Sequence, residues 1–501
     1  MIQIIQDKLF ILIKSNQHHE GWAEYMTRPF EARLTPFNLI SICFLIATLM
    51  LGSATTVFAG WLYPLGETRE KTKFSEEHIQ LRAPSATGVR PPLIYEGGDL
   101  FLGSGKLNEG FETPWGAVWQ PQLWIFATVR SAVYTFDDGV NSPSAEWGTR
   151  LDLYGNIQLT GTEKILIGFR PLDRNRSDRF SRVTFNDNLG GSQEEFNLDI
   201  RTLFFEGDIG SLFPGLDKAG VKKLDYGFTV GRQLLQYQEG ILLNDEVDVV
   251  GLVRNNIRLP FISNLRTSLV YGWNEVGRGN AGNNDDANLI GFFNSIDTHV
   301  STLSLDAVYT SDNDRNGDGY YLGLSAIQRI GHFNTAFRVN ASIAENKDSV
   351  RVADGALFSS EISFTPYRSD DIVYLNTFIT AGNFTQAGRE PVVGGPLGAL
   401  GILFASPSLG NFGSELNSFA NEVAGFALGY EAFWDNHRRS LTLEVAGRQD
   451  ISGNGFSDLA VGFEFRQRLL QRLQLQVDAH RSFQESRDDG FGTRVELQYQ
   501  F

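Results

Sequence analysis

The feature that most constrains this chain is an alternation of apolar and polar residues that recurs along much of its length. In the last eleven residues, FGTRVELQYQF (491–501), one alternate set consists of Thr493, Val495, Leu497, Tyr499 and Phe501. The other set is polar and consists of Arg494, Glu496, Gln498 and Gln500. A period of two is typical of a β-strand, whose side chains point alternately to two opposite faces. The sequence therefore ends in a predicted strand with one apolar and one charged face.

The same alternation predicts strands at 149–159, 163–170, 196–204 and 332–343, and three more between 440 and 480. Many of these runs hold about 9 to 13 residues, which is the length that a tilted strand needs to cross a bilayer. A soluble β-sandwich would need a partner sheet and usually has strands of about 5 to 6 residues. A lipid-facing apolar band and a polar lumen explain both faces. We therefore predict an all-β, closed antiparallel transmembrane β-barrel.

The links between the predicted strands alternate between short and long. The short links lie at 161–162, 259–263, 331, 367–370, 435–437 and 469–470, and the long ones at 172–194, 311–319, 344–355, 385–421, 450–456 and 484–490. Outer-membrane barrels have short periplasmic turns and longer outer loops. Keeping this alternation requires an extra strand near 288–295, which brings the count to about 18, with 16 as the fallback. We expect the final strand to pair with the first, near 122–136, because closure leaves no free edge.

The N-terminal region is predicted to contain an export signal followed by an extension. An apolar run at 39–51 follows Arg28 and Arg33 and leads to small residues near Ala59, which predicts a signal peptide over 26–59. A membrane anchor is the alternative, and residues 1–25 are interpreted as an over-long start. Cys43 is the one cysteine of the sequence and falls in this signal, so the exported chain would have no disulfide. Residues 60–118 show little alternation and are expected to form a periplasmic extension or a plug.

The final strand, with Val495, Leu497, Tyr499 and Phe501, resembles the terminal strand of bacterial outer-membrane barrels of the porin type. In that class the alternating apolar residues and the terminal aromatic are read by the barrel assembly machinery. The resemblance covers residues 119–501 and implies a barrel surrounded by lipid in the outer membrane of a Gram-negative bacterium. A narrower segment, 231–252, is similar to substrate-specific porins of the alginate-export kind at Arg232, Gln233, Gly240 and Asp248.

The charged faces of the predicted strands suggest what the barrel does. We predict a channel, not an enzyme, through which small polar or charged solutes diffuse. Its lumen would be lined by Arg130, Arg150, Asp152, Asp199, Arg201, Arg254, Arg338, Glu444, Arg494 and Glu496. Both signs are nearly balanced in this set, so it does not indicate a preference for anions or cations. The net charge of −16 argues against nucleic acid as a partner.

Two other groups of residues could carry chemistry. Asp312, Asp314, Asn316 and Asp318 have the spacing of oxygen ligands in a calcium loop, although Gly323 stands where such a loop places a bidentate glutamate. A plain outer turn is the alternative, and no other cofactor is expected. Asp478, His480 and Ser482 share one strand face and could suggest a hydrolase, but an ordinary polar ladder in the lumen explains them as well.

The link at 390–419 is unusually apolar for an exposed loop. It could fold into the lumen as a constriction or plug, insert at the membrane rim, bind a neighbouring subunit of a homo-oligomer, or be a flexible loop. If it or residues 60–118 closed the pore, the protein would be a plugged barrel that anchors or sheaths a periplasmic or surface partner. That structural role is the alternative to the channel.

Overall fold

The computed structural model describes residues 93–98, 108–173, 181–185, 192–216, 224–278, 287–312, 317–390, 393–453 and 455–501. All of them belong to the unit that runs from Phe74 to Phe501. No helix among the described residues is long and apolar enough to span a membrane.

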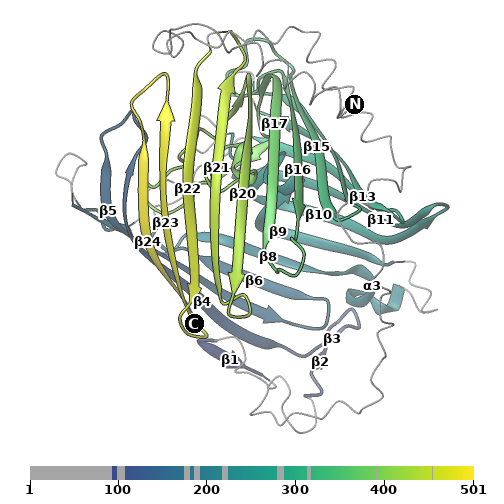
Figure 1. Cartoon of the computed structure of the whole chain (residues 1–501). Coiled ribbons are helices and arrows are strands. Elements are labelled where there is room, and N and C mark those ends of the chain that lie inside the picture. The colour runs from purple at the N-terminus through teal and green to yellow at the C-terminus, as the bar shows by residue number, and fades with distance from the viewer. Residues whose placement is uncertain are drawn as a thin grey trace, which may run out of the picture. The chain divides into compact units, whose positions relative to one another are not determined.

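Eighteen strands of the described chain form one closed antiparallel wall (Figure 1). They are β4 (Gln122–Asp137), β5 (Ser144–Gln158), β6 (Lys164–Phe169), β8 (Ile200–Asp208), β9 (Tyr226–Tyr237), β10 (Leu243–Leu259), β11 (Ile262–Asn274), β12 (Asn288–Asp297), β13 (Ser301–Ser311), β14 (Gly319–Ile330), β15 (Phe333–Ala344), β16 (Gly355–Phe364), β17 (Ile372–Phe384), β20 (Val423–Trp434), β21 (Arg439–Asp450), β22 (Ser457–Arg468), β23 (Leu473–Gln484) and β24 (Phe491–Gln500). The prediction of an 18-strand barrel is confirmed.

Closure occurs where the sequence predicts it. The last strand, β24, pairs with the first wall strand, β4, from Phe491 opposite Asp137 to Gln500 opposite Thr128. The extra strand expected near 288–295 is β12, which pairs with β13. A short strand, β1 (Tyr95–Gly97), pairs with β4 from Tyr95 opposite Ile125 to Gly97 opposite Leu123, on the stretch just beyond the end of β24.

The two faces of the wall differ as the alternation requires. On β24 the outward side chains of Val495 and Leu497 are 50% and 43% exposed, whereas the inward side chains of Arg494 and Glu496 are 4% and 2% exposed. The outer face therefore offers apolar groups to lipid, and the inner face keeps its charges in contact with one another.

The remaining described elements are short. They are β2 (Phe111–Glu112), β3 (Val118–Trp119), β7 (Ser181–Thr184), β18 (Gly388–Arg389), β19 (Ala420–Asn421), the helix α3 (Ile209–Leu212) and the 3-10 turns η3 (Pro214–Leu216), η4 (Gln238–Gly240) and η6 (Pro396–Ala399). Strand β7 pairs with Glu146–Thr149 of β5, and β6 pairs with the later stretch of β5 from Leu153 to Gln158. The strand predicted at 196–204 begins four residues later, at Ile200, because residues 196–199 do not join the ladder.

Candidate functional site: a lumen narrowed by two inward segments

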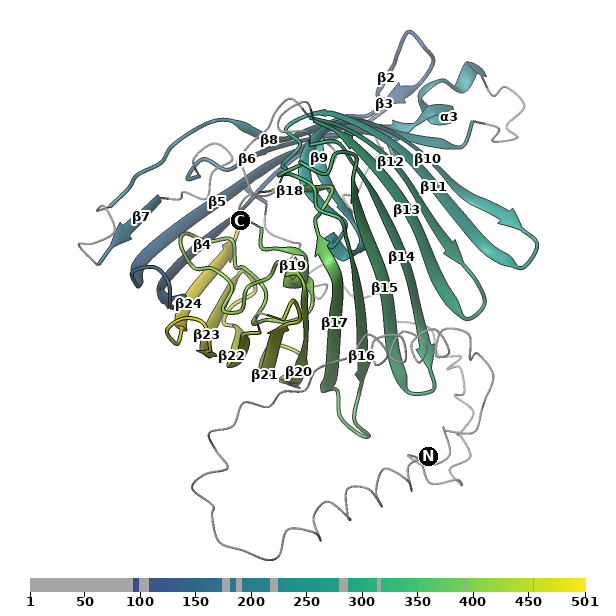
Figure 2. The ribbon, with the colours of Figure 1, turned by 90° about the horizontal axis from the view of Figure 1, so that it is seen from above.

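The link between β17 and β20, residues 385–422, folds into the barrel (Figure 2). Its Leu397, Leu400 and Phe404 are completely buried and pack in one cluster with Leu357 of β16 and Phe378 of β17. Farther along, Leu409 and Phe412 pack against Ala132, Tyr134 and Phe136 on the inner face of β4. The apolar character of 390–419 is therefore explained by contact with the inner wall. We call residues 385–422 the inner loop.

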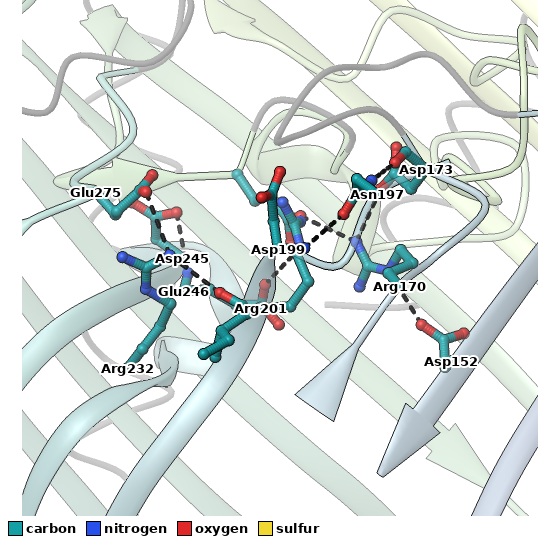
Figure 3. Close-up of polar contacts among 12 residues, drawn as sticks. Asp152, Arg170, Asp173, Asn197, Asp199, Arg201, Arg232, Asp245, Glu246 and Glu275 are labelled. Carbon is teal, nitrogen blue, oxygen red and sulfur yellow. Dashed lines mark hydrogen bonds and ion pairs between the residues drawn. The ribbon is translucent and has the colours of Figure 1, made fainter. Parts of the chain in front are cut away.

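Paired charges hold the start of the inner loop (Figure 3). Glu390 accepts a hydrogen bond from Arg170, whose Nη1 lies 3.2 Å from Oε1, and it also pairs with Arg201 of β8. Arg170 donates from Nε to Asp152 of β5 at 3.0 Å, and Arg201 lies 3.3 Å from Glu246 of β10. All five side chains are buried, where a charge is stable only if it is paired and hydrogen-bonded.

The link after β6 contributes one further acid to this network. Asp173 lies 3.4 Å from Arg170, and Asn197 donates a hydrogen bond to its carbonyl oxygen. Burial raises the pKa of the Asp173 carboxyl to about 6, although the charge of Arg170 acts in the opposite direction.

The rest of the inner loop is tied to the wall by polar contacts. Arg130 pairs with Glu496 and also donates to the carbonyl of Pro407 at 3.1 Å. Arg150 pairs with Asp152 and donates to the carbonyl of Ser408 at 3.2 Å. These arginines use one side of the guanidinium for a wall carboxylate and the other for the loop backbone, so the same groups line the lumen and fix the loop.

Carboxylates fix two other points of the inner loop. Glu444 of β21 accepts hydrogen bonds from the backbone N–H groups of Ile402 and Leu403, at 3.0 and 2.9 Å. Glu415 of the loop lies 2.7 Å from Nδ1 of His480 on β23.

A second inward segment is the link 238–242 between β9 and β10. Gly231 has φ of 123°, and a Cβ at this position would lie 2.2 Å from the carbonyl oxygen of Leu203. Beyond this bend, the link 238–242 turns into the lumen, and Leu242 packs in the apolar cluster that includes Phe293 and Tyr321. Gln238 of this link donates to Asp306 on β13 at 2.6 Å.

Cavities remain in the described lumen beside these two segments. The first has a volume of about 520 Å³ and is lined by β8 to β15 and by the link 238–242. A neighbouring cavity of about 430 Å³ shares Glu239, Ile327 and Arg338 with it. The third, of about 500 Å³, lies between the inner loop and β4, β17 and β22 to β24. The inner loop and the link therefore narrow the lumen but leave polar space on both sides.

The structure places most of the predicted lining residues on the inner face. Arg130, Arg150, Asp152, Arg201, Arg338, Glu444, Arg494 and Glu496 all lie there. Asp199 precedes β8 and is exposed, and its backbone N–H donates to Asn197. Arg254 shares the strand face of Val250 and Leu252, which is the outer face, and its guanidinium lies 4.5 Å from the ring centroid of Tyr226.

The narrower resemblance at 231–252 falls on the bend of β9. Arg232 forms a two-point hydrogen bond with Asp248, at 2.8 and 2.9 Å, and lies 3.2 Å from Glu275. Gln233 lines the first cavity, and Gly240 is part of η4. Arg232 thus binds neighbouring strands at the bend.

The predicted calcium loop is only partly described. Asp314 and Asn316 lie outside the described residues, and Asp312 faces Arg278 and Arg351 at 3.5 and 4.0 Å. The Asp318 carboxylate accepts a hydrogen bond from the backbone N–H of Asp312. Calcium binding remains a prediction.

Asp478, His480 and Ser482 have other partners: Asp478 pairs with Arg494 at 2.8 Å, His480 with Glu415, and Ser482 bonds with Gln484.

Sequence reasoning missed Glu390, Glu246 and the serines of the first cavity. Glu390 stands in a loop, where no alternation indicates the direction of a side chain. Glu246 lies near the bend that follows Gly231, where the alternation of β9 and β10 no longer reports the inner face. The serines do follow the alternation, but their alignment depends on the register between strands, which a single sequence does not show.

Comparison with known proteins supports the fold. No family model and no curated protein matches the chain significantly. Solved structures do, each covering 76% of this chain. They include a BenF-like porin from Pseudomonas fluorescens Pf-5 (TM-score 0.53, 9% identity, 98% of that chain), Pseudomonas aeruginosa OccK2 in complex with glucuronate (0.52, 12%, 98%) and P. aeruginosa OpdK with vanillate (0.51, 12%, 98%).

At these identities the matches establish the fold alone. The shared part of the chain has the size of the eighteen-strand wall, and the wall is closed and apolar outside. The chain is therefore an outer-membrane β-barrel with the fold of the porins.

Proposed function

We propose that this barrel is a channel through which small polar or charged solutes diffuse across the outer membrane. The observation that carries the proposal is the polar space left beside the inner loop, in cavities of about 520, 430 and 500 Å³. A loop that served only to seal the barrel would have no reason to leave charged cavities of a size typical of small-molecule sites.

The charges of the lumen define how such a channel selects solutes. Arg130 and Arg494 face Glu496 and Asp478 on one side of the lumen, and Arg338 faces Glu361 on another. These ion pairs join neighbouring strands, so the lumen presents both signs of charge along its wall, and such charges order water and screen solutes by size and charge. The inner loop sets the size limit, and the ion pairs that hold it keep this limit constant.

The solved structures indicate the size of solute that this fold admits. One contains glucuronate and another contains vanillate, and both are small organic acids. Solutes of this size fit cavities of about 500 Å³.

Single-channel recording in planar bilayers tests the proposal, with protein purified from the outer membrane. We expect steady openings, and we expect removal of residues 395–416 to raise the conductance severalfold, since the inner loop narrows the lumen. A barrel that inserts but conducts only without this loop would instead be the plugged anchor. Silence both with and without the loop would contradict the channel.

A further inference from the structure

A row of three serines crosses the wall of the first cavity. Strand register places Ser295 of β12 opposite Ser304 of β13, and Ser304 opposite Ser325 of β14. Arg266 of β11 and Arg338 of β15 stand at the two ends of this row. All five residues line the cavity of about 520 Å³. Side chains in directly opposed positions have Cβ atoms about 5 Å apart, so the row forms a continuous polar strip.

The hydroxyl groups of this serine row are available to a solute. The side-chain hydroxyls of Ser295, Ser304 and Ser325 form no hydrogen bond with any residue in the described parts of the chain, and only the backbones of these serines take part in the strand ladders. Each hydroxyl can both donate and accept a hydrogen bond. Thr229 and Gln233 of β9 line the opposite side of the same cavity, together with Tyr237. A solute here meets hydroxyl and amide groups on two sides and an aromatic ring.

The charges around the row do not favour an anion. The first cavity and its neighbour are lined by four carboxylates, Glu206, Glu239, Asp306 and Glu361, and by two guanidinium groups, Arg266 and Arg338. Arg338 is 3% exposed and is shared by Glu361 and Glu239.

Arg266 forms no ion pair with a described residue, and neither does Asp306 in the same cavity, so their charges offset each other. Glu206 is neutralised by Lys164 at 2.7 Å. Carboxylate recognition relies on guanidinium groups free to form two-point hydrogen bonds, and only Arg266 meets that condition here.

We propose that this cavity binds neutral solutes with several hydroxyl groups, of monosaccharide size, in preference to organic anions. This inference rests on the proposed channel function and names its substrate class. Hydroxyl groups of the solute replace the water that bonds to the serine row, and no buried charge has to be neutralised. An anion of the same size enters a cavity whose carboxylates outnumber its guanidinium groups, so it meets repulsion.

Glucose and glucuronate form a matched pair of probes, because they differ by one hydroxymethyl group that is replaced by a carboxylate. Proteoliposomes that contain the full barrel are placed in solutions of each solute at equal osmolarity, and the rate of swelling is measured. We expect glucose to enter about fivefold faster or more. Faster entry of glucuronate would overturn the inference and leave the channel intact. No entry of either solute, with no ionic current, would overturn the channel function itself.

Variants separate the hydroxyl groups from the charges. We expect the triple variant S295A/S304A/S325A to raise the half-saturating glucose concentration about fivefold or more, because one lost neutral hydrogen bond already gives about this factor. The control Ser359→Ala, which is buried on β16 outside the cavity lining, should leave glucose saturation unchanged. Unchanged glucose saturation in the triple variant would contradict the site.

Two further variants keep the test decisive. The single variant Ser304→Ala changes only the middle of the row and preserves the assembly of the barrel if the triple variant fails to fold. Asp306→Asn removes one negative charge and leaves the serines in place. We expect it to accelerate glucuronate entry, whereas a glucuronate rate identical to that of the unmodified barrel would contradict the role of charge.

Discussion

Glu390 shows how one residue can control the lumen. It is buried in the inner loop, its carboxylate pairs with Arg170 and Arg201, and its backbone N–H bonds to Asn244 at 3.0 Å. These contacts join the inner loop to β8, to β10 and to the link that follows β6. Because the two arginines are themselves buried, loss of the carboxylate would leave two guanidinium charges short of a partner.

We therefore expect Glu390→Gln to destabilise the fold by roughly 3 to 5 kcal/mol. We also expect it to increase current noise, since the start of the inner loop loses its ion pairs with Arg170 and Arg201. Urea unfolding and single-channel recording measure the two effects. The matched control is Asp435→Asn, whose exposed pair with Arg439 should contribute about 1 kcal/mol or less. Equal effects of the two variants would contradict the role of Glu390.

At the residue scale, the strand face on which a side chain lies was easier to predict from the sequence than the residue that it contacts. Arg130, Arg150 and Arg338 point inward because they follow the alternation of long regular strands. Arg254 does not line the lumen, since the alternation of β10 places it with Val250 and Leu252 on the outer face. The partner of Arg170 in the inner loop lies 220 residues away, and no local pattern reports such a contact.

At the element scale, the bend in β9 decides where the space in the barrel lies. The positive φ of Gly231 and the near contact with Leu203 leave no room for a side chain. The link 238–242, which follows β9, enters the lumen, and its Gln238 and Glu239 line the first cavity. The inward direction of this link was not predicted from the sequence, because it depends on packing against β12 to β14.

We expect Gly231→Ala to reduce the amount of assembled barrel, because an alanine at this φ costs about 1 to 3 kcal/mol and its Cβ would collide with the backbone of β8. Gly155→Ala is the control, since a Cβ there meets nothing within 4 Å. The folded fraction is measured by the difference in gel mobility between heated and unheated samples. If both variants assembled equally, the bend would not depend on glycine.

At the scale of the whole molecule, the strand count and the closure follow from sequence alone. Every wall strand needs one apolar face toward lipid, so apolar and polar residues alternate with a period of two in each of them. The filling of the lumen was not predictable in this way. The inner loop could equally have met the membrane rim or another subunit, because its apolar residues require a partner surface without specifying which one.

We expect removal of Phe501 to lower the amount of assembled barrel severalfold. Its backbone N–H bonds to Ala127 at 2.9 Å, its ring lies 4.8 Å from that of Tyr499, and the resemblance to porin-type strands implies recognition of this residue during assembly. Phe261→Ala, at a tip where the side chain is 93% exposed, is the control. Immunoblots of outer-membrane fractions compare the two, and equal amounts would argue against an assembly role for Phe501.

The pairing of β1 with β4 has a consequence for the order of events during biogenesis. Strand β24 and strand β1 lie along the same edge of β4, one after the other, so the seam is completed by segments from opposite ends of the chain. Strand β1 lies about 30 residues before its partner stretch on β4, so this pairing closes a short loop, whereas the pairing of β24 with β4 closes a loop that spans the whole wall. Because a short loop costs less conformational entropy to close, we expect the part of the seam at β1 to form before the part at β24.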